Sequence, residues 1–370
     1  MVDVARRNLF QEKLRFIISA GGVALAIMLM VILNGFFAGM NRQVSAYLDN
    51  TPVDLVVSQK KVKNFLGASS RVPLQDGTKV EKTAGVRKVI PIFSSYTVLE
   101  LGGRREFSLL IGFDPDNGGG PWRIVEGTDN INDDEVIFDK LVADRHGFKL
   151  GRRVRILGKD FKIAGLSSGT SSWMTGTFFV TFESASRLLA AGDSAGFLLV
   201  SAEDKAGIAD LKSRLSSEFP DLTVTTKDER AKNDVALYAG VFNKPLQVMV
   251  IIAFLIGVML VGATIYTATV ERAREYGMMK AVGARNSMLY RVVFEQALIV
   301  AVAGFVLGVA LSFLAKVVIA WFAPQFFVLI EWPYLAYVAL IAILIGIVAS
   351  YVPVRTIAGI DPAIAFKRGV

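Results

Sequence analysis

Four long stretches of the chain carry no charged residue, and polar or charged sequence separates them. They are Phe16–Asn41, Pro245–Val270, Gln296–Ala315 and Trp332–Val354. About 20 consecutive apolar residues are enough for a helix to cross a bilayer, so each stretch predicts one membrane-spanning helix. The third helix is expected to begin earlier, near Met288. A signal peptide is the alternative for the first stretch, but the apolar run is too long and no clear small-residue cleavage site follows it.

The sequence between the first and second stretches has a different periodicity. Short runs with turn residues between them predict strands, and three longer runs predict helices. The expected strands are Val53–Ser58, Val86–Ile92, Ser94–Leu101, Arg105–Gly112, Glu135–Phe138, Val154–Leu157, Phe161–Leu166, Phe178–Phe182 and Gly196–Ser201. The expected helices are Phe138–His146, Ser184–Ala191 and Lys205–Phe219. Runs of strands with a few helices indicate an α+β domain of one or two subdomains.

Two segments join this region to the apolar stretches, Ala38–Asn50 and Asp228–Lys244. Both have a composition that a helix accepts. We therefore expect each to continue its membrane helix outward, so that two helices form a stalk below the α+β domain. An ordinary loop at each place is the alternative.

Composition and charge support a membrane protein. Hydrophobic residues make up 53% of the 370 residues and charged residues 20%, below the roughly 25% that is usual for soluble domains. The net charge is +8, but lysine and arginine lie beside the apolar stretches, which favours a membrane over nucleic acid as the partner. The chain has no cysteine, which excludes disulfides, thiolate metal sites and a cysteine nucleophile.

The distribution of lysine and arginine also predicts the orientation. Both chain ends and the loop 271–291 are rich in basic residues, whereas the loop 316–331 contains only Lys316. Basic loops stay on the cytoplasmic side. The fold expected is therefore a membrane protein with four transmembrane α-helices, one N-terminal and three C-terminal. A large extracytoplasmic α+β domain lies between the first and second helices, and both termini are cytoplasmic.

The loop between the second and third spans has the most specific pattern in the chain. A charged, partly helical loop between two spans is well placed for contact with a soluble partner. Met278 and Met279 offer adaptable apolar contacts, and Gly283 can end a helix in the left-handed conformation. The general basicity of cytoplasmic loops does not explain the full spacing of Glu271, Arg272, Glu275, Gly277, Ala281 and Gly283.

Small residues recur at helical spacing in three of the apolar stretches. Gly304 and Gly308 form one such pair, Gly35 and Gly39 form another, and Gly346 lies on a small-residue face of the last stretch. Such faces let membrane helices approach closely. An acid at the start of a span is costly and usually has a partner or a function, so Glu295 is a candidate, with an interfacial position as the equal alternative.

Several kinds of chemistry have no support in the sequence. No phosphate-binding loop of the type Gly-x-x-x-x-Gly-Lys-Ser/Thr occurs, so the chain is not expected to hydrolyse ATP itself. No base accompanies the serines of the loop 168–172, and His146 is the single histidine. We therefore expect no catalytic residue, no metal site and no bound cofactor.

The loop 271–284 resembles the signature of the FtsX/MacB family of ABC transporter permeases, which includes MacB, DevC and LolC types. The resemblance implies that the candidate contact residues for an ATPase are Glu271, Arg272, Glu275, Gly277, Met278, Met279, Lys280, Ala281, Gly283 and Ala284. Glu295 with its following glycines, and the tail Pro353–Arg368 with Asp361 before Pro362, are similar to the same family. The resemblance covers the three C-terminal spans closely and the rest in layout. It implies a first span with its N-terminus in 1–40, a MacB-like domain with a helical stalk in 41–244, an FtsX-like domain in 245–355 with a coupling loop at 271–290, and a cytoplasmic tail in 356–370.

The resemblance also implies a function and partners. Members act as permease subunits in the bacterial inner membrane, as a homodimer or with a paralogue, and two copies of a separate ATPase subunit bind the ATP and Mg²⁺. The motion of the ATPase expels a hydrophobic or amphipathic substrate (a lipid, glycolipid, drug, peptide or haem-like molecule) by mechanotransmission, with membrane lipid around the spans. A periplasmic adaptor is an open further partner. Two alternatives remain: an FtsX-type regulator of a cell-wall hydrolase, and a lipoprotein-release permease of the LolC/LolE type.

Overall fold

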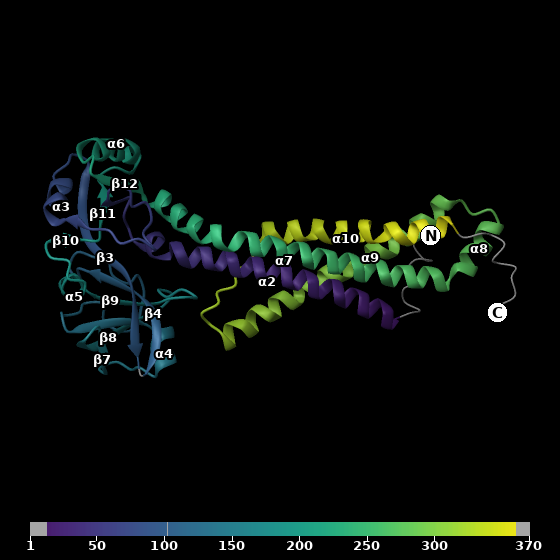
Figure 1. Cartoon of the computed structure of the whole chain (residues 1–370), viewed down its shortest axis with the longest axis horizontal. Helices are drawn as coiled ribbons and strands as arrows, with labels where there is room; N and C mark the ends of the chain where they lie inside the picture. The colour runs from purple at the N-terminus through teal and green to yellow at the C-terminus, as the bar shows by residue number, and fades with distance from the viewer. Residues whose placement is uncertain (1–12, 102, 360–370) are drawn as a thin grey trace. The chain divides into compact units, whose positions relative to one another are not determined.

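The computed structural model describes residues 13–101 and 103–359, and four long helices dominate it (Figure 1). They are α2 (Lys13–Asn50), α7 (Lys227–Glu271), α9 (Asn286–Phe322) and α10 (Trp332–Ala358). Within the described residues, these are the four helices long and apolar enough to cross a membrane. The four predicted spans are confirmed, although α9 extends well beyond Ala315 and α10 continues past Pro353.

The two segments beside the α+β region are helical. Residues 38–50 belong to α2, and residues 228–244 belong to α7, so each is continuous with an apolar stretch. The chain forms two compact units. Among the described residues, the first contains 13–38, 242–322 and 328–359, and the second contains 39–241 and 323–327.

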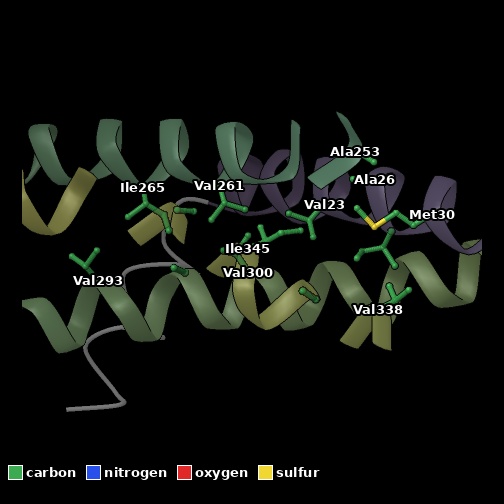
Figure 2. Close-up of a cluster of buried hydrophobic side chains, with 14 of the residues drawn as sticks. Val23, Ala26, Met30, Ala253, Val261, Ile265, Val293, Val300, Val338 and Ile345 are labelled. Atoms are coloured by element: carbon green, nitrogen blue, oxygen red, sulfur yellow. The ribbon is translucent and has the colours of Figure 1, made fainter. Parts of the chain in front are cut away.

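The core of the first unit is a cluster of aliphatic side chains from all four helices (Figure 2). Val23 and Met30 of α2 lie in it, together with Val261 of α7, Val300 of α9 and Ile345 of α10. Lipid tails are as apolar as these side chains, so the hydrophobic effect contributes little to helix association there. Close packing and small residues must therefore hold the helices together.

Glycines provide that close packing between α2, α9 and α10. A Cβ added at Gly304 would lie 2.5 Å from the Cβ of Val23, and one at Gly308 would lie 2.7 Å from the carbonyl oxygen of Ala24. A Cβ at Gly346 would lie 3.3 Å from the carbonyl oxygen of Ala297. The backbone of α9 therefore approaches α2 more closely than any residue with a side chain would allow.

Gly35 and Gly39 were expected to pack against another helix, and this expectation is wrong. Both face the connection between α9 and α10. The Leu329 N–H donates to the Gly35 carbonyl at 2.8 Å, and a Cβ added at Gly39 would lie 1.6 Å from the carbonyl oxygen of Phe327. The repeat of small residues allows close approach, but it does not specify whether a helix or a loop fills the space.

Gln43 fixes the same connection inside the second unit. Its side-chain Nε2 donates to the carbonyl of Gln325 at 3.4 Å, and its Oε1 accepts from the backbone N–H of Trp173 at 3.2 Å. The rings of Trp173 and Phe326 stack with centroids 6.5 Å apart. One amide thus links the segment 323–327 to the loop that precedes β9.

The second unit is built on a mixed sheet. Its described strands follow the order β12-β1-β11-β3-β4-β9-β6-β8-β5, with β7 also paired to β8. β4 pairs with β9 and β6 with β8 in parallel, and the other pairs are antiparallel. The strands are β1 (Leu55–Gln59), β3 (Val86–Leu101), β4 (Arg104–Phe113), β5 (Ile124–Gly127), β6 (Glu135–Asp139), β7 (Arg153–Ile156), β8 (Lys159–Ser167), β9 (Gly176–Thr181), β11 (Phe197–Ala202) and β12 (Leu222–Thr226). The short strands β2 (Val72–Pro73) and β10 (Ser194–Ala195) form a separate pair.

The strand prediction was wrong in one instructive place. Val86–Ile92 and Ser94–Leu101 were expected as two strands, but β3 is a single strand that changes partner along its length. Its first half pairs with β11, and its second half pairs with β4 from Phe93 onward. A change of partner leaves the backbone extended, so local sequence cannot reveal that the strand continues. The sequence analysis also missed the strands β5 and β12 and the helix α3 (Leu74–Glu81).

Helices and helix ends cover both faces of the sheet. α3 and α6 (Ile208–Glu218) pack through Val80 and Leu215 on one face of β1 and β11, where Leu55 points. Val56, the next residue, points to the opposite face and packs with Tyr47 of α2. α4 (Lys140–His146) and α5 (Phe182–Leu188) cover the other half of the sheet. Burial on both faces explains why β1, β9 and β11 have almost continuous apolar sequences.

Two buried charged residues of α7, Arg230 and Asp234, lie where α7 meets the sheet, ahead of the uncharged stretch 245–270. Arg230 is fully buried, and its guanidinium donates to the side chains of Thr225 and Ser58 at 2.9 and 2.8 Å. The carboxylate of Asp234 accepts from the backbone N–H of Phe65 at 2.9 Å. Burial raises the pKa of Asp234 to about 6, although the hydrogen bonds from Leu66 and Phe65 and the charge of Arg230 lower it.

We predict that stability falls as the pH rises through this range. The pKa of the Asp234 carboxyl is about 6 in the folded chain and about 3.9 in the unfolded chain. Its effect on the free energy of unfolding is therefore most favourable below the unfolded pKa and is lost as the pH rises above the folded pKa. The loss amounts to about 3 kcal/mol at most. The melting temperature of the full chain in detergent should fall between about pH 4 and 6, the window that the two pKa values bracket. Asp234→Asn should flatten this slope, and an unchanged slope would contradict the assignment.

Candidate functional site

The loop after α7 contains the short helix α8 (Ala273–Ala281), which holds most of the candidate contact residues. Gly283 follows it with φ +98°, a conformation that favours glycine. Its N–H donates to the Lys280 carbonyl at 3.0 Å, and the Ala284 N–H donates to the Met279 carbonyl at 2.9 Å. These two bonds form a Schellman motif, so Gly283 ends the helix in the left-handed conformation.

α8 has one face toward the membrane helices and one face toward solvent. Tyr276 and Gly277 are buried, and Met279 packs against the core of the first unit. Met278 is 47% exposed and Val282, one residue beyond the helix, is 91% exposed. Arg274, Glu275 and Ala281 also lie on the exposed side.

Met278 and Met279, which were both expected to offer contact surface, differ in exposure: Met278 is exposed, whereas Met279 is half-buried against the core of the first unit. The two positions are about 100° apart around the helix axis, so their side chains leave the helix in different directions. The sequence analysis missed Val282, which together with Met278 and Ala281 forms the exposed apolar strip of the loop. No feature of the sequence marks Val282, because its exposure depends on what the other helices cover.

A charge pair joins the end of α7 to the beginning of α2. Arg15 binds Glu271 with two hydrogen bonds, and the distance from Nη2 to Oε1 is 2.6 Å. The two side chains are 38% and 48% exposed, so solvent screens their attraction and the pair contributes little to the stability of the fold. Its importance is geometric, because it connects the residue that precedes α8 to another membrane helix. Arg15 was absent from the sequence candidates.

A second link joins α8 to the end of α10. The ammonium group of Lys280 donates to the carbonyls of Ile357 and Ala358 at 2.7 and 3.1 Å. These carbonyls belong to the last turn of α10, where a cation also interacts favourably with the helix dipole. Glu271 and Lys280 thus hold the loop in place. Nη1 of Arg272, the N-cap residue of α8, lies 3.8 Å from Oε2 of Glu275 in the first turn of that helix.

Two family models together match nearly the whole sequence. The model described as MacB-like periplasmic core domain matches residues 16–218, and the model described as FtsX-like permease C-terminal matches residues 247–362. The first alone covers more than half of the 370 residues. The chain belongs to the MacB/FtsX family of ABC transporter permeases.

Two curated proteins and one solved structure illustrate what the chain is similar to. An uncharacterised ABC transporter permease of Mycobacterium tuberculosis strain H37Rv is 26% identical over 99% of both chains. The macrolide export ATP-binding/permease protein MacB of Shewanella sp. strain W3-18-1 is 30% identical over 123 residues, which are 33% of this chain and 19% of MacB. The periplasmic region of MacB from Actinobacillus actinomycetemcomitans covers 50% of this chain and 92% of its own, with 16% identity and a TM-score of 0.38.

In this ABC transporter permease, only one of the two carboxylate oxygens of Glu295 has a hydrogen-bond partner among the described residues. Its Oε1 accepts from Nε of Arg291 at 2.8 Å, one helical turn earlier in α9. Its Oε2 is buried without a hydrogen-bond partner among the described residues. The acid therefore enters the span with a cation from its own helix. Asp361 and Pro362, the remaining part of the family-like tail, lie outside the described residues.

Proposed function

We propose that this permease is the membrane subunit of an ATP-driven exporter that works by mechanotransmission. It would move a hydrophobic or amphipathic substrate, such as a lipid, glycolipid, drug, peptide or haem-like molecule, out of the membrane or the periplasm. The observation that carries the proposal is the exposed strip of Met278, Ala281 and Val282 on a loop that is anchored on both sides. An apolar strip rimmed by charge is typical of a protein-binding surface.

The two anchors suggest how force leaves the loop. A push on α8 reaches α2 through Glu271 and Arg15, because the charge pair links them directly. It reaches α10 through Lys280, which caps the last turn of that helix. Arg272 is the single residue between α7 and α8, so α7 leads almost directly into α8. α2 and α7 also extend well beyond their apolar stretches, which suits helices that transmit displacement along their axes.

The partners follow from the family and stay part of the proposal. Two copies of a separate ATPase subunit would hold ATP and Mg²⁺, and this chain would supply no cofactor site and no catalytic residue. Two permease chains, identical or paralogous, would form the complex in the bacterial inner membrane. Both termini and the coupling loop 271–290 would face the cytoplasm, and the domain of residues 41–244 would face outward, where a periplasmic adaptor can bind.

Copurification tests the proposal. The tagged full chain is isolated from its native membranes in detergent, and proteins and lipids are identified by mass spectrometry. A stoichiometric ATPase subunit whose hydrolysis responds to the permease supports the exporter. Recovery of a cell-wall hydrolase points to the FtsX-type regulator, and mislocalised lipoproteins after depletion point to the LolC/LolE type. The absence of any ATPase would overturn the proposal.

We predict that the Arg15–Glu271 pair matters for coupling more than for stability. Arg15→Glu or Glu271→Arg alone places like charges together and should lower substrate-stimulated ATPase activity several-fold. The double variant restores opposite charges and should recover most of it. Each melting temperature should change little, because solvent screens the attraction between two partly exposed side chains. If the double variant is as inactive as the singles, the pair does not transmit force.

A further inference from the structure

A small cavity lies at the end of the first unit that carries the basic loop. Its volume is about 30 Å³, which holds about two water molecules or one small ion. Its lining comes from α2, α7 and α9 and from the loop that contains α8. The cavity therefore lies where four segments of the first unit meet.

Three neutral polar side chains in the lining lack a hydrogen-bond partner among the described residues. Ser19 of α2 is 1% exposed, and its hydroxyl oxygen is buried without a partner. Tyr276 is 5% and Gln296 is 7% exposed, and neither side chain makes a hydrogen bond within residues 13–101 and 103–359. A buried polar group without a partner is costly, so each of the three requires a bound water or ligand.

Ser19 is an exception among the hydroxyl groups of the long helices. The hydroxyls of Thr264, Thr267 and Ser312 each donate to the carbonyl one turn earlier, at 2.9, 2.9 and 2.7 Å. A serine or threonine inside a helix commonly satisfies its hydroxyl in this way. The Ser19 hydroxyl makes no such bond to the carbonyl of Arg15, so its proton is available to a ligand in the cavity.

The charge of the lining decides between water and an ion. Arg15 and Arg272 both belong to the lining, and no acidic residue does among the part of the chain that the structure describes. Glu271, which pairs with Arg15, is outside the lining. The Arg272 side chain is 14% exposed, whereas Glu275, at 3.8 Å from it, is 61% exposed and screened by solvent. Two guanidinium groups together with hydroxyl and carboxamide donors can offset the loss of hydration of an anion.

We propose that this cavity binds one small monovalent anion of the size of chloride. The hydroxyls of Ser19 and Tyr276 and the carboxamide of Gln296 donate to it, and the two arginines of the lining balance its charge. Sulfate, phosphate and lipid head groups are too large for the volume. The ion connects the first turns of α2 to α8, so it holds the loop against the membrane helices. This site goes beyond the proposed exporter function.

Chloride NMR of the purified full chain in dodecyl maltoside tests the inference. The chain is prepared in sodium gluconate and titrated with sodium chloride at constant ionic strength. We expect a saturable broadening of the chloride resonance that bromide reverses by competition and sulfate does not. Broadening that fails to saturate would indicate adventitious surface binding, and competition by sulfate would indicate a larger site. Either result would overturn the inference.

Substitutions of single hydroxyl groups locate the site. Ser19→Ala and Tyr276→Phe should each weaken chloride binding about tenfold, because a hydrogen bond to a charged group is lost. Thr267→Val and Tyr266→Phe remove the same kinds of hydroxyl from α7 outside the lining and should bind chloride as the native chain does. Unchanged chloride binding in both Ser19→Ala and Tyr276→Phe would contradict the proposal.

Thermal unfolding distinguishes loss of the ion from loss of the fold. Chloride should raise the melting temperature of the native chain in a saturable manner, because a ligand that binds only the folded state stabilises it. Ser19→Ala should melt no lower than the native chain in gluconate, since it removes a hydroxyl that has no partner there, but chloride should raise its melting temperature much less. An equal rise in both chains would contradict the assigned contact. The assay needs no ATPase, so its outcome is independent of the copurification that tests the exporter.

Discussion

Val282→Asp should abolish coupling between this permease and its ATPase while leaving the chain folded and inserted. Val282 is 91% exposed in the structure, so the substitution removes no packing inside the chain. Placing a charge in an apolar contact with a partner typically costs about 2 kcal/mol or more, which is about thirtyfold in affinity. ATPase recovered with the tagged chain and substrate-stimulated hydrolysis should therefore both fall steeply.

Two control variants make this result specific. Leu157→Asp introduces the same charge at a residue that is 46% exposed in a turn of the second unit, with φ +47°, a conformation that aspartate tolerates. It should leave coupling unchanged. Met279→Asp buries a charge against the core of the first unit, so it should lower the amount of folded protein as well as its activity. Normal ATPase recovery with Val282→Asp would show that the strip is not the contact surface.

Gly39→Ala should destabilise the second unit, although alanine is normally the better residue in a helix. A Cβ at Gly39 would lie 1.6 Å from the carbonyl oxygen of Phe327, and this backbone atom cannot rotate away. The segment 323–327 must then shift and loosen its contacts with Gln43 and Trp173. Overpacking of this kind costs about 1–3 kcal/mol.

Gly21 provides the matched control on the same helix. A Cβ added there meets nothing within 4 Å, so Gly21→Ala should be neutral or stabilise by about 0.5–1 kcal/mol through helix propensity. Thermal unfolding gives the stability of both variants. Chymotrypsin, which cleaves after phenylalanine, should cut faster at Phe326 and Phe327 in Gly39→Ala alone. Equal cleavage of both variants would mean that Gly39 does not hold the segment in place.

Local sequence predicts much of this architecture. The four spans are predictable because hydrocarbon excludes charge over a fixed length, and a run such as Pro245–Val270 satisfies that condition by itself. The helical end at Gly283 is predictable because glycine adopts positive φ without strain. The α+β nature of the outer domain follows from periodicity, although single elements such as β12 were missed.

The sequence by itself therefore determined the class of the protein, the number of spans and the position of the basic loop between the second and third spans, since each depends on properties of neighbouring residues. Only the tertiary structure decided which residues of that loop are free to bind a partner, because exposure depends on what other helices cover. In the structure, Met279 packs against the core of the first unit and Val282 is exposed. Glu271 pairs with Arg15, which is far away in the chain. Gly39 makes the same point: local spacing showed that something packs closely against it, but only the fold could bring the carbonyl of Phe327 there.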